Sequence, residues 1–169
     1  MKQMTNIAIA TDPRDGQQIL LLTDAEEKMI VPMSITLNDA QSINMALNCV
    51  SPVKPLTHQL LLNFASEAGR YFERVEIDLC ADGSFFATIK IGNSVYPNNS
   101  MDLVANPADG IVVAIRAKVP IFVSDAVWET CVKPAKSAQR DDAEKEQFKQ
   151  FVESVKASDF KIEGLSNHP

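Results

Sequence analysis

The segment 106–116 constrains the fold more than any other part of the chain, because it encodes a helix start in consecutive side chains. Asn106 predicts the N-cap, since its side-chain oxygen can accept a hydrogen bond from a free amide of the first turn. Pro107 suits the first helical position, where its missing N–H costs nothing, and Asp109 places negative charge near the positive end of the helix dipole. One apolar face follows at helical spacing: Ile111, Ala114 and Ile115.

A similar pattern occurs sixty-eight residues earlier, in segment 38–47. Four residues are identical at this offset: Asn38, Ala40, Ile43 and Ala46 correspond to Asn106, Ala108, Ile111 and Ala114. The turn pairs 15–16 and 82–83, both Asp-Gly, precede strand-like runs at an offset of sixty-seven. These repeats predict an α+β fold in which a duplicated β-β-β-α-α unit forms a single domain.

The patterns of apolar and turn residues predict the elements of both halves. Strands are expected at 6–11, 18–23, 28–35, 74–79, 84–91, 101–104 and 120–123. Helices are expected from 38 to 48, from an N-cap at Thr57 to a stop at Gly69, from 106 to 116, and from a cap at Asp125. Pro32 inside the third strand indicates a sheet edge or a bulge. The second helix has an apolar stripe that includes Leu60 and Phe64.

Three regions are expected along the chain. Residues 1–132 form the domain, residues 133–140 read as a linker, and residues 141–169 contain a C-terminal helix and tail. The helix, at 141–157, is amphipathic and needs a partner surface for its apolar face. That face carries Phe148, Phe151, Val152 and Val155.

Length and composition limit the class of protein. A chain of 169 residues can bury one substantial core. It has no apolar run of the ~20 residues that span a membrane, and no secretory signal pattern. Three widely spaced cysteines form neither a disulfide framework nor a zinc site, and Cys49, Cys80 and Cys131 are expected to be small core residues. A cytoplasmic protein without a membrane partner is expected.

Two motifs resemble the bifunctional nuclease domain family. Lys54-Pro-Leu-Thr-His-Gln-Leu60 is similar to the family's Arg-Pro-Leu-Thr-His-Asp-Leu, and Asn106-Pro-Ala-Asp-Gly-Ile111 is similar to its Arg-Pro-Ser-Asp-Ala-Ile. The resemblance covers roughly residues 6–132. It implies an α+β fold built by duplication, subunits that associate, and nuclease activity on both RNA and DNA.

Three positions depart from the family motifs. Asn106 replaces an arginine, Ala108 a serine, and Gln59 an aspartate. If the arginine held a phosphate, this chain lacks the guanidinium group that binds it through two parallel hydrogen bonds. If the acidic and hydroxyl groups served a metal, that site has fewer ligands here.

His58 is one of two histidines in the chain, and the other lies in the last two residues. Functionally, His58 can move a proton at neutral pH or bind a metal. Structurally, a histidine in a first helical turn can instead bond a neighbouring carbonyl. The sequence leaves both roles open.

Asp39 and Asp109 both lie near predicted helix starts. Together they could share a divalent cation, Mg²⁺ or Mn²⁺, that activates water against a phosphodiester. Separately, each would satisfy first-turn amides and the helix dipole. The catalytic hypothesis takes Asp39, His58 and Asp109 as the catalytic residues, with the two aspartates as metal ligands. No dinucleotide fingerprint is present, and no organic cofactor is expected.

The residues expected to bind the substrate are Lys54, Thr57, Asn106 and Arg116. Lys54 and Arg116, with Lys118, flank the two motifs and could contact a phosphate backbone. The alternative is that they are scattered surface cations, and Arg116 can equally compensate a helix C-terminus.

Two hypotheses of function follow. In the first, the chain is a metal-dependent nuclease acting on RNA or DNA phosphodiesters. In the second, it is a non-catalytic binding or assembly module on the same scaffold, acting through a protein partner or through homo-oligomerisation, with a dimer favoured. The formal net charge of −6 supports the second hypothesis, because the overall field works against nucleic acid binding.

Overall fold

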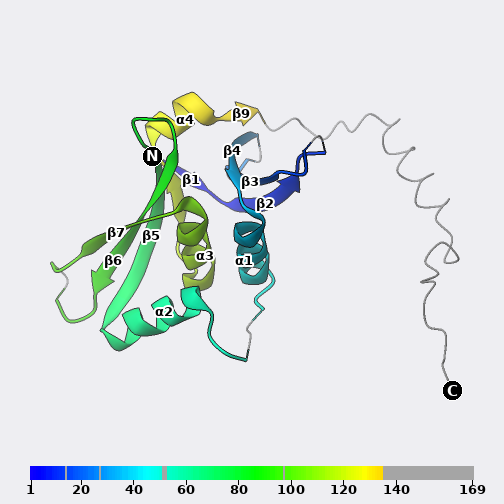
Figure 1. Ribbon diagram of the computed structural model, residues 1–169. Coiled ribbons are helices and arrows are strands. Elements are labelled where there is room, and N and C mark those ends of the chain that lie inside the picture. The colour runs from blue at the N-terminus through cyan, green and yellow to red at the C-terminus, as the bar shows by residue number, and fades with distance from the viewer. Residues whose placement is uncertain (14, 27, 51–52, 97, 135–169) are drawn as a thin grey trace, which may run out of the picture. The chain divides into compact units, whose positions relative to one another are not determined.

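The computed structural model describes residues 1–13, 15–26, 28–50, 53–96 and 98–134 (Figure 1). The strands are β1 (Lys2–Met4), β2 (Asn6–Thr11), β3 (Gln18–Thr23), β4 (Met29–Ile35), β5 (Arg70–Leu79), β6 (Phe85–Asn93), β7 (Met101–Ala105), β8 (Ile121–Val123) and β9 (Lys133–Pro134). The helices are α1 (Leu37–Leu47), α2 (Thr57–Glu67), α3 (Pro107–Ala117) and α4 (Asp125–Cys131). Four helices and two sheets among these residues confirm the α+β class.

The strands form two sheets. The first has the order β1-β8-β5-β6-β7 and the second the order β2-β3-β4-β9. Neighbouring strands are antiparallel except for β5 and β8, which are parallel. Since β9 pairs only with Met29 and Ile30 of β4, Pro32 lies on a stretch that has β3 on one side alone. This placement agrees with the edge position predicted for Pro32.

Helix α3 lies at the centre of the fold. It packs against β5 and β6 on one side and against α1 on another (Figure 1). Its start is the one that the sequence predicted, with Asn106 as N-cap and Pro107 at the first helical position. Six of its residues are buried: Ala108, Gly110, Ile111, Val112, Val113 and Ala114. All of them except Gly110 join buried residues of both sheets and of α1 in one hydrophobic cluster.

The other helix starts differ from the prediction. The N-cap of α1 is Thr36, and Asn38 lies inside the first turn. Helix α2 has Leu56 at its N-cap position, without a side-chain hydrogen bond, and Thr57 is its first residue. Helix α4 is capped by Ser124, whose hydroxyl accepts from the amide of Val127. The sequence suggested Asn38, Thr57 and Asp125 because these residue types favour N-caps. In each case a residue one or two positions earlier has the extended conformation that a cap requires.

The helix starts also change the alignment of the two halves. The caps Thr36 and Asn106 are seventy residues apart, so the four identities at an offset of sixty-eight pair non-equivalent helical positions. Both halves do contain three antiparallel strands followed by an eleven-residue helix. They diverge afterwards, because α2 follows α1 directly whereas β8 separates α3 from α4. A common ancestor of the two halves stays a prediction.

Several elements and burial states were not predicted. Strand β1 pairs with β8, and Lys133–Pro134 form β9 rather than the start of a linker. Cys49 and Cys80 are exposed and Cys131 is half-buried, so the expectation that all three are core residues was wrong. The remainder of the predicted linker and the helix at 141–157 lie outside the described residues. No helix among the residues that the structure describes has the length and apolarity to cross a membrane.

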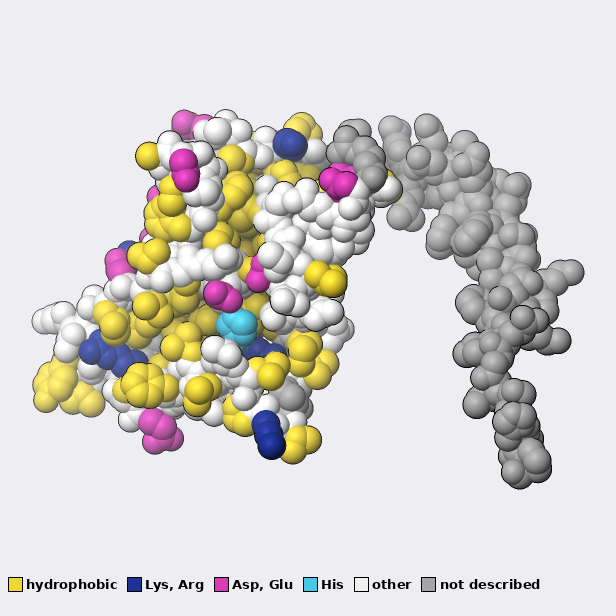
Figure 2. Space-filling view, viewed as in Figure 1, with side chains coloured by type: hydrophobic (Ala, Val, Ile, Leu, Met, Phe, Trp, Pro, Cys, Tyr) yellow, Lys and Arg dark blue, Asp and Glu magenta, His cyan; other side chains and the backbone are white. Residues whose placement is uncertain are grey.

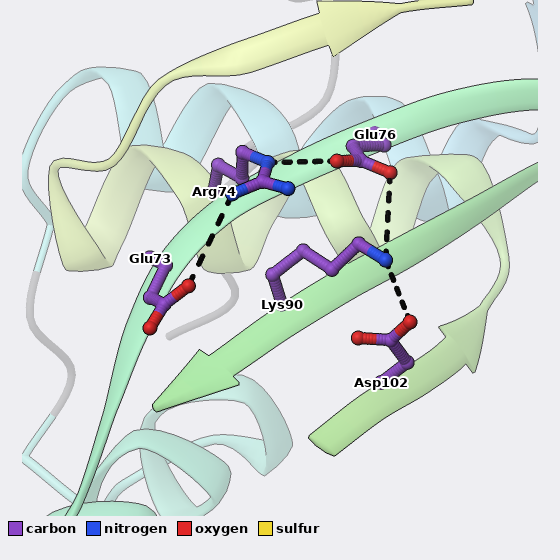
Figure 3. A network of polar contacts seen from close by, with 5 residues as sticks. All are labelled: Glu73, Arg74, Glu76, Lys90 and Asp102. Carbon is purple, nitrogen blue, oxygen red and sulfur yellow. Dashed lines mark hydrogen bonds and ion pairs between the residues drawn. The ribbon is translucent and has the colours of Figure 1, made fainter. Parts of the chain in front are cut away.

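The face of the first sheet opposite α3 carries a network of charged side chains (Figure 3). Lys90 of β6 contacts Asp102 at 2.6 Å and Glu76 at 3.6 Å. Arg74 donates from Nε to Glu76 at 2.7 Å and lies 4.0 Å from Glu73. The hydrogen bond to Asp102 raises the pKa of Lys90 above its ordinary value, and the charge of Glu76 adds to this effect. The network links β5, β6 and β7 across the sheet.

We expect Lys90→Met to lower the free energy of unfolding by about 1 kcal/mol, because Glu76, with a side chain only 15% exposed, loses a partner. This stabilisation should be present below the ordinary lysine pKa of about 10.4 and lost as the pH rises through the raised pKa. Chemical denaturation at neutral pH measures the change. Lys28→Met is the control, since Lys28 pairs with Glu26 on the open surface and should leave stability unchanged. Equal losses in both variants would contradict the assignment.

Candidate functional site

His58 and Asp109 meet at the starts of two helices. His58 is the second residue of α2, and Asp109 is the third residue of α3. His58 Nε2 lies 3.0 Å from Asp109 Oδ1, a hydrogen-bond distance between residues fifty-one positions apart. The histidine side chain is 20% exposed and the aspartate 55%. The contact therefore joins the two motifs at a position that solvent and ligands can reach.

The pair lines a pocket of about 410 Å³. Helix α2 contributes Thr57 and Leu61 beside His58, and β7 contributes Leu103 and Ala105. Apart from Thr57, His58 and Asp109, the walls are apolar. Low-polarity walls around a few convergent polar groups are typical of ligand sites.

The same helical position has different partners in α1 and α3. Asp39 is the third residue of α1, and its Oδ2 accepts from the amide of Thr36 at 3.0 Å and from the Thr36 hydroxyl at 2.7 Å. This is a capping box, in which the carboxylate bonds back to its own helix start. In α3 the Asn106 side chain accepts from the amide of Ala108, and Asp109 contacts His58. Of the two aspartates, only Asp109 points into the histidine pocket.

Asp39 lines a different pocket, of about 560 Å³, together with Asn106. The two aspartates that were predicted to share a metal therefore face separate hollows. Within the described part of the chain, no group of three or more His, Cys, Asp or Glu side chains is arranged to hold a metal ion. The donor set does not fit a two-carboxylate metal centre, because the Asp39 carboxylate is committed to Thr36.

The three predicted cations do not line the histidine pocket. Arg116, in the last turn of α3, donates from Nη2 to the carbonyl oxygen of Val50 at 3.4 Å. Its Nε is buried and has no hydrogen-bond partner among the described residues. Lys54 is exposed in the segment before α2, and Lys118 is the left-handed C-cap of α3. Lys54 and Lys118 are both exposed, and of the three cations Lys54 lies nearest in sequence to the pocket residues Thr57 and His58.

Sequence reasoning missed the contribution of β7 to the pocket. Leu103 was assigned to a short strand at 101–104, Ala105 followed that strand, and neither was given a role at the site. The pairing of β7 with β6 could have indicated this contribution, because it sets Leu103 opposite Ile89 and Ala105 opposite Ala87. Ile89 and Ala87 are buried on the α3 side of the sheet, so Leu103 and Ala105 share that side.

Comparison with known proteins gives the chain its family. Two proteins of Mycobacterium tuberculosis, one from each of two strains and both named uncharacterized, are 30% identical to it over 169 residues. The alignments cover 95% of this chain and 99% of each relative. The family model of the bifunctional nuclease domain matches residues 20–136, a span that includes His58 and Asp109. The match confirms the resemblance seen in the two motifs, and the chain belongs to the bifunctional nuclease domain family.

Proposed function

We propose that the chain hydrolyses phosphodiester bonds of RNA or DNA, with His58 and Asp109 as the working pair. The observation that carries this proposal is the 3.0 Å contact between His58 Nε2 and Asp109 Oδ1 inside an open pocket. A base oriented by a carboxylate is a recurring device of hydrolytic sites. Membership of the family supports the substrate class.

The proposed roles follow from the geometry of the ring. With its proton on Nε2, His58 donates to Asp109, and Nδ1 is left as an acceptor. Nδ1 removes a proton from a water molecule as the water oxygen bonds to phosphorus. The ester P–O bond breaks, the departing oxygen takes up a proton from solvent water, and the imidazolium of His58 afterwards releases its extra proton to solvent. Asp109 holds the orientation of the His58 ring and stabilises its imidazolium form while the ring carries the extra proton.

Substrate binding is assigned to Lys54 and Thr57, and a positioning role to Arg116. Lys54 is exposed before α2 and Thr57 lines the pocket, so both are proposed to contact the nucleic acid. Arg116 donates to the Val50 carbonyl and is proposed to fix the chain that leads into α2. The proposal includes a divalent cation, and the assay below tests whether one is required. Asp109 would be its carboxylate ligand, since Mg²⁺ often uses one carboxylate with substrate phosphates and water.

A non-catalytic assembly module is the second candidate. Leu60 and Phe64, on the predicted apolar stripe of α2, are exposed. Gln59, which replaces the family's aspartate, donates to Asn63 at 2.9 Å and stays on its own helix. Large apolar side chains on a helix surface favour a protein partner. This candidate predicts association without hydrolysis.

Purified full-length chain should be incubated with end-labelled single-stranded RNA and DNA, in Mg²⁺, in Mn²⁺ and in a chelator. We expect cleavage by the wild type, and cleavage about 10²–10⁴-fold slower by the His58→Ala/Asp109→Ala double variant. Equal cleavage by both proteins would identify a contaminating nuclease and end the proposal. Association of a chain that never cleaves would support the assembly module. Activity that survives the chelator would exclude a required divalent cation.

A further inference from the structure

We propose that the pocket between the starts of α1 and α3 binds a nucleobase, and that adenine fits it best. The base lies against the ring of Phe85 and forms hydrogen bonds with the open edge of β4. The assignment of this pocket stands on its own geometry. Its role in placing a nucleic acid for cleavage rests on the proposed function.

The pocket has the size of a ligand site and lies close to the working pair. Its volume of about 560 Å³ is within the range of small-molecule sites. Pro107 lines it, whereas Asp109 lines the histidine pocket. Residues two apart on a helix point about 200° apart, so the two pockets lie on opposite sides of the first turn of α3. Figure 2 shows hydrophobic and acidic side chains over the region where Figure 1 places the starts of α1 and α3.

One wall of the pocket is an open strand edge. The amide of Asp24 donates to the carbonyl oxygen of Met29 at 3.2 Å, and hydrogen-bonded pairs alternate along an antiparallel ladder. The odd-numbered residues of β4 therefore bond to β3, and the even-numbered ones turn their backbone groups to the other side. Ile30 pairs with β9 on that side. Beyond it, no described strand covers Pro32 and Ser34, and both line the pocket.

The open edge presents its backbone groups in a fixed order. Pro32 offers a carbonyl oxygen and has no amide, and Ser34 then offers an amide followed by a carbonyl oxygen. Adenine presents an amino donor, then the acceptor N1, then a C–H group, which matches this order. In the same register cytosine sets its carbonyl oxygen against that of Ser34, and guanine sets a second donor against the Ser34 amide. A peptide strand fits less well, because strands usually pair over three residues or more.

The other walls favour an uncharged flat ring. Phe85 alternates with Ala87 and Ile89, which are buried under α3, so its half-buried ring lies on that side of the sheet. Aromatic rings bind bases by stacking. Among the described residues that line the pocket there is no lysine or arginine, and Asp39 adds a negative charge. The base therefore enters the pocket, and the phosphate groups of a nucleotide stay outside it.

Nucleosides without phosphate test the site directly. The full-length chain should be titrated calorimetrically with adenosine, with cytidine and with D-ribose. We expect adenosine to bind, cytidine to bind about tenfold more weakly, and ribose not to bind. The absence of adenosine binding overturns the proposal. Equal binding of adenosine and cytidine overturns the assignment of adenine, and equal binding of ribose shows that no base is recognised.

Ser34→Pro tests the hydrogen bond from β4. Proline is tolerated where the amide of an edge strand points away from its partner, so the change removes the donor and keeps the pairing with β3. We expect adenosine binding to weaken about tenfold. Ser34→Ala is the matched control, because it keeps the amide and loses only the hydroxyl. Equal binding by the two variants overturns the role of β4.

Phe85→Leu provides a test that does not depend on the fold of the proline variant, whose folding thermal denaturation checks. Leucine keeps an apolar side chain beside the core but has no ring to stack on a base. We expect adenosine binding to weaken about tenfold at near wild-type stability. Unchanged binding in a folded Phe85→Leu variant overturns the placement of the base.

The two proposals fail separately. Adenosine binding by a chain that cleaves no nucleic acid supports the base pocket and removes the nuclease. Cleavage by a chain that does not bind adenosine supports the nuclease and removes the base pocket. If both hold, His58→Ala should bind adenosine as the wild type does. Oligoadenylate should then have a lower KM than oligocytidylate, and Ser34→Pro should remove the difference.

Discussion

His58→Ala should cleave single-stranded nucleic acid about 10²–10⁴-fold more slowly than the wild type, with little change in stability. The factor is the usual contribution of a positioned proton-transfer group. The stability expectation follows from the position of the side chain, which lines an open pocket and is absent from the buried core. Initial rates at saturating substrate, together with thermal denaturation, measure both quantities.

Asp109→Asn separates the roles within the pair. The amide keeps the shape and an oxygen acceptor, but it has no charge to stabilise the imidazolium form. We expect a loss in kcat that approaches that of His58→Ala. The double variant should be no slower than His58→Ala alone, because residues that act as one unit give non-additive losses. Losses that multiply in the double variant would indicate two independent roles.

Asp39→Asn is the informative comparison, since Asp39 occupies the same helical position in α1. Its carboxylate accepts from the amide and hydroxyl of Thr36. We expect a loss of about 1 kcal/mol in unfolding free energy and unchanged cleavage. Loss of cleavage in this variant, at wild-type stability, would return Asp39 to the active site and contradict the separation of the two pockets.

The contrast between Asp39 and Asp109 shows where prediction from sequence ends. Both residues carried the same signal, an acidic side chain in a first helical turn, and both were predicted to cap or to bind metal. The cap residue decides between these roles locally. Thr36 offers a hydroxyl and an amide to Asp39, whereas Asn106 satisfies the amide of Ala108 and leaves Asp109 to a partner from another helix. That partner lies fifty-one residues away, at a distance that no local pattern encodes.

Local signals predicted most of the secondary structure. The strand predicted at 84–91 is β6, with Ala87 and Ile89 in the core and Lys90 on the other side. The failures were β1 and β9, three-residue and two-residue strands that exist because a partner strand is present. The apolar stripe predicted for α2 includes Leu60 and Phe64, and the structure leaves both side chains exposed. Helical periodicity marks an apolar face but does not show which surface covers it.

Gly110→Val should lower the free energy of unfolding by about 3 kcal/mol, the largest change in stability expected for the chain. Gly110 is a buried residue of α3, in its first turns. A Cβ atom there would lie 2.7 Å from the Cβ of Ala87 and 3.1 Å from Cγ1 of Val75. Both neighbours belong to core strands of the first sheet, so neither can swing away as a flexible side chain could. The helix would have to move off the sheet.

Gly110→Ala adds only the Cβ atom, so it measures the cost of the contact between that atom and Ala87. Replacing glycine by alanine in an exposed helix gains about 1 kcal/mol, so the contact with Ala87 must outweigh that gain. We expect a net loss of about 1–2 kcal/mol by chemical denaturation. The Gly110→Ala/Ala87→Gly double variant exchanges the two methyl positions. It should be more stable than the sum of the two single changes by about 1 kcal/mol, since the added carbon then occupies the space that was vacated.

The opposite result would have a definite meaning. If Gly110→Ala were stabilising by about 1 kcal/mol and additive with Ala87→Gly, helix propensity alone would account for it. Helix α3 would then have to lie further from β5 and β6 than the structure places it. Because α3 also carries Asp109, such a displacement would alter the distance to His58. The packing of one glycine is thus a test of the scaffold that brings the two side chains together.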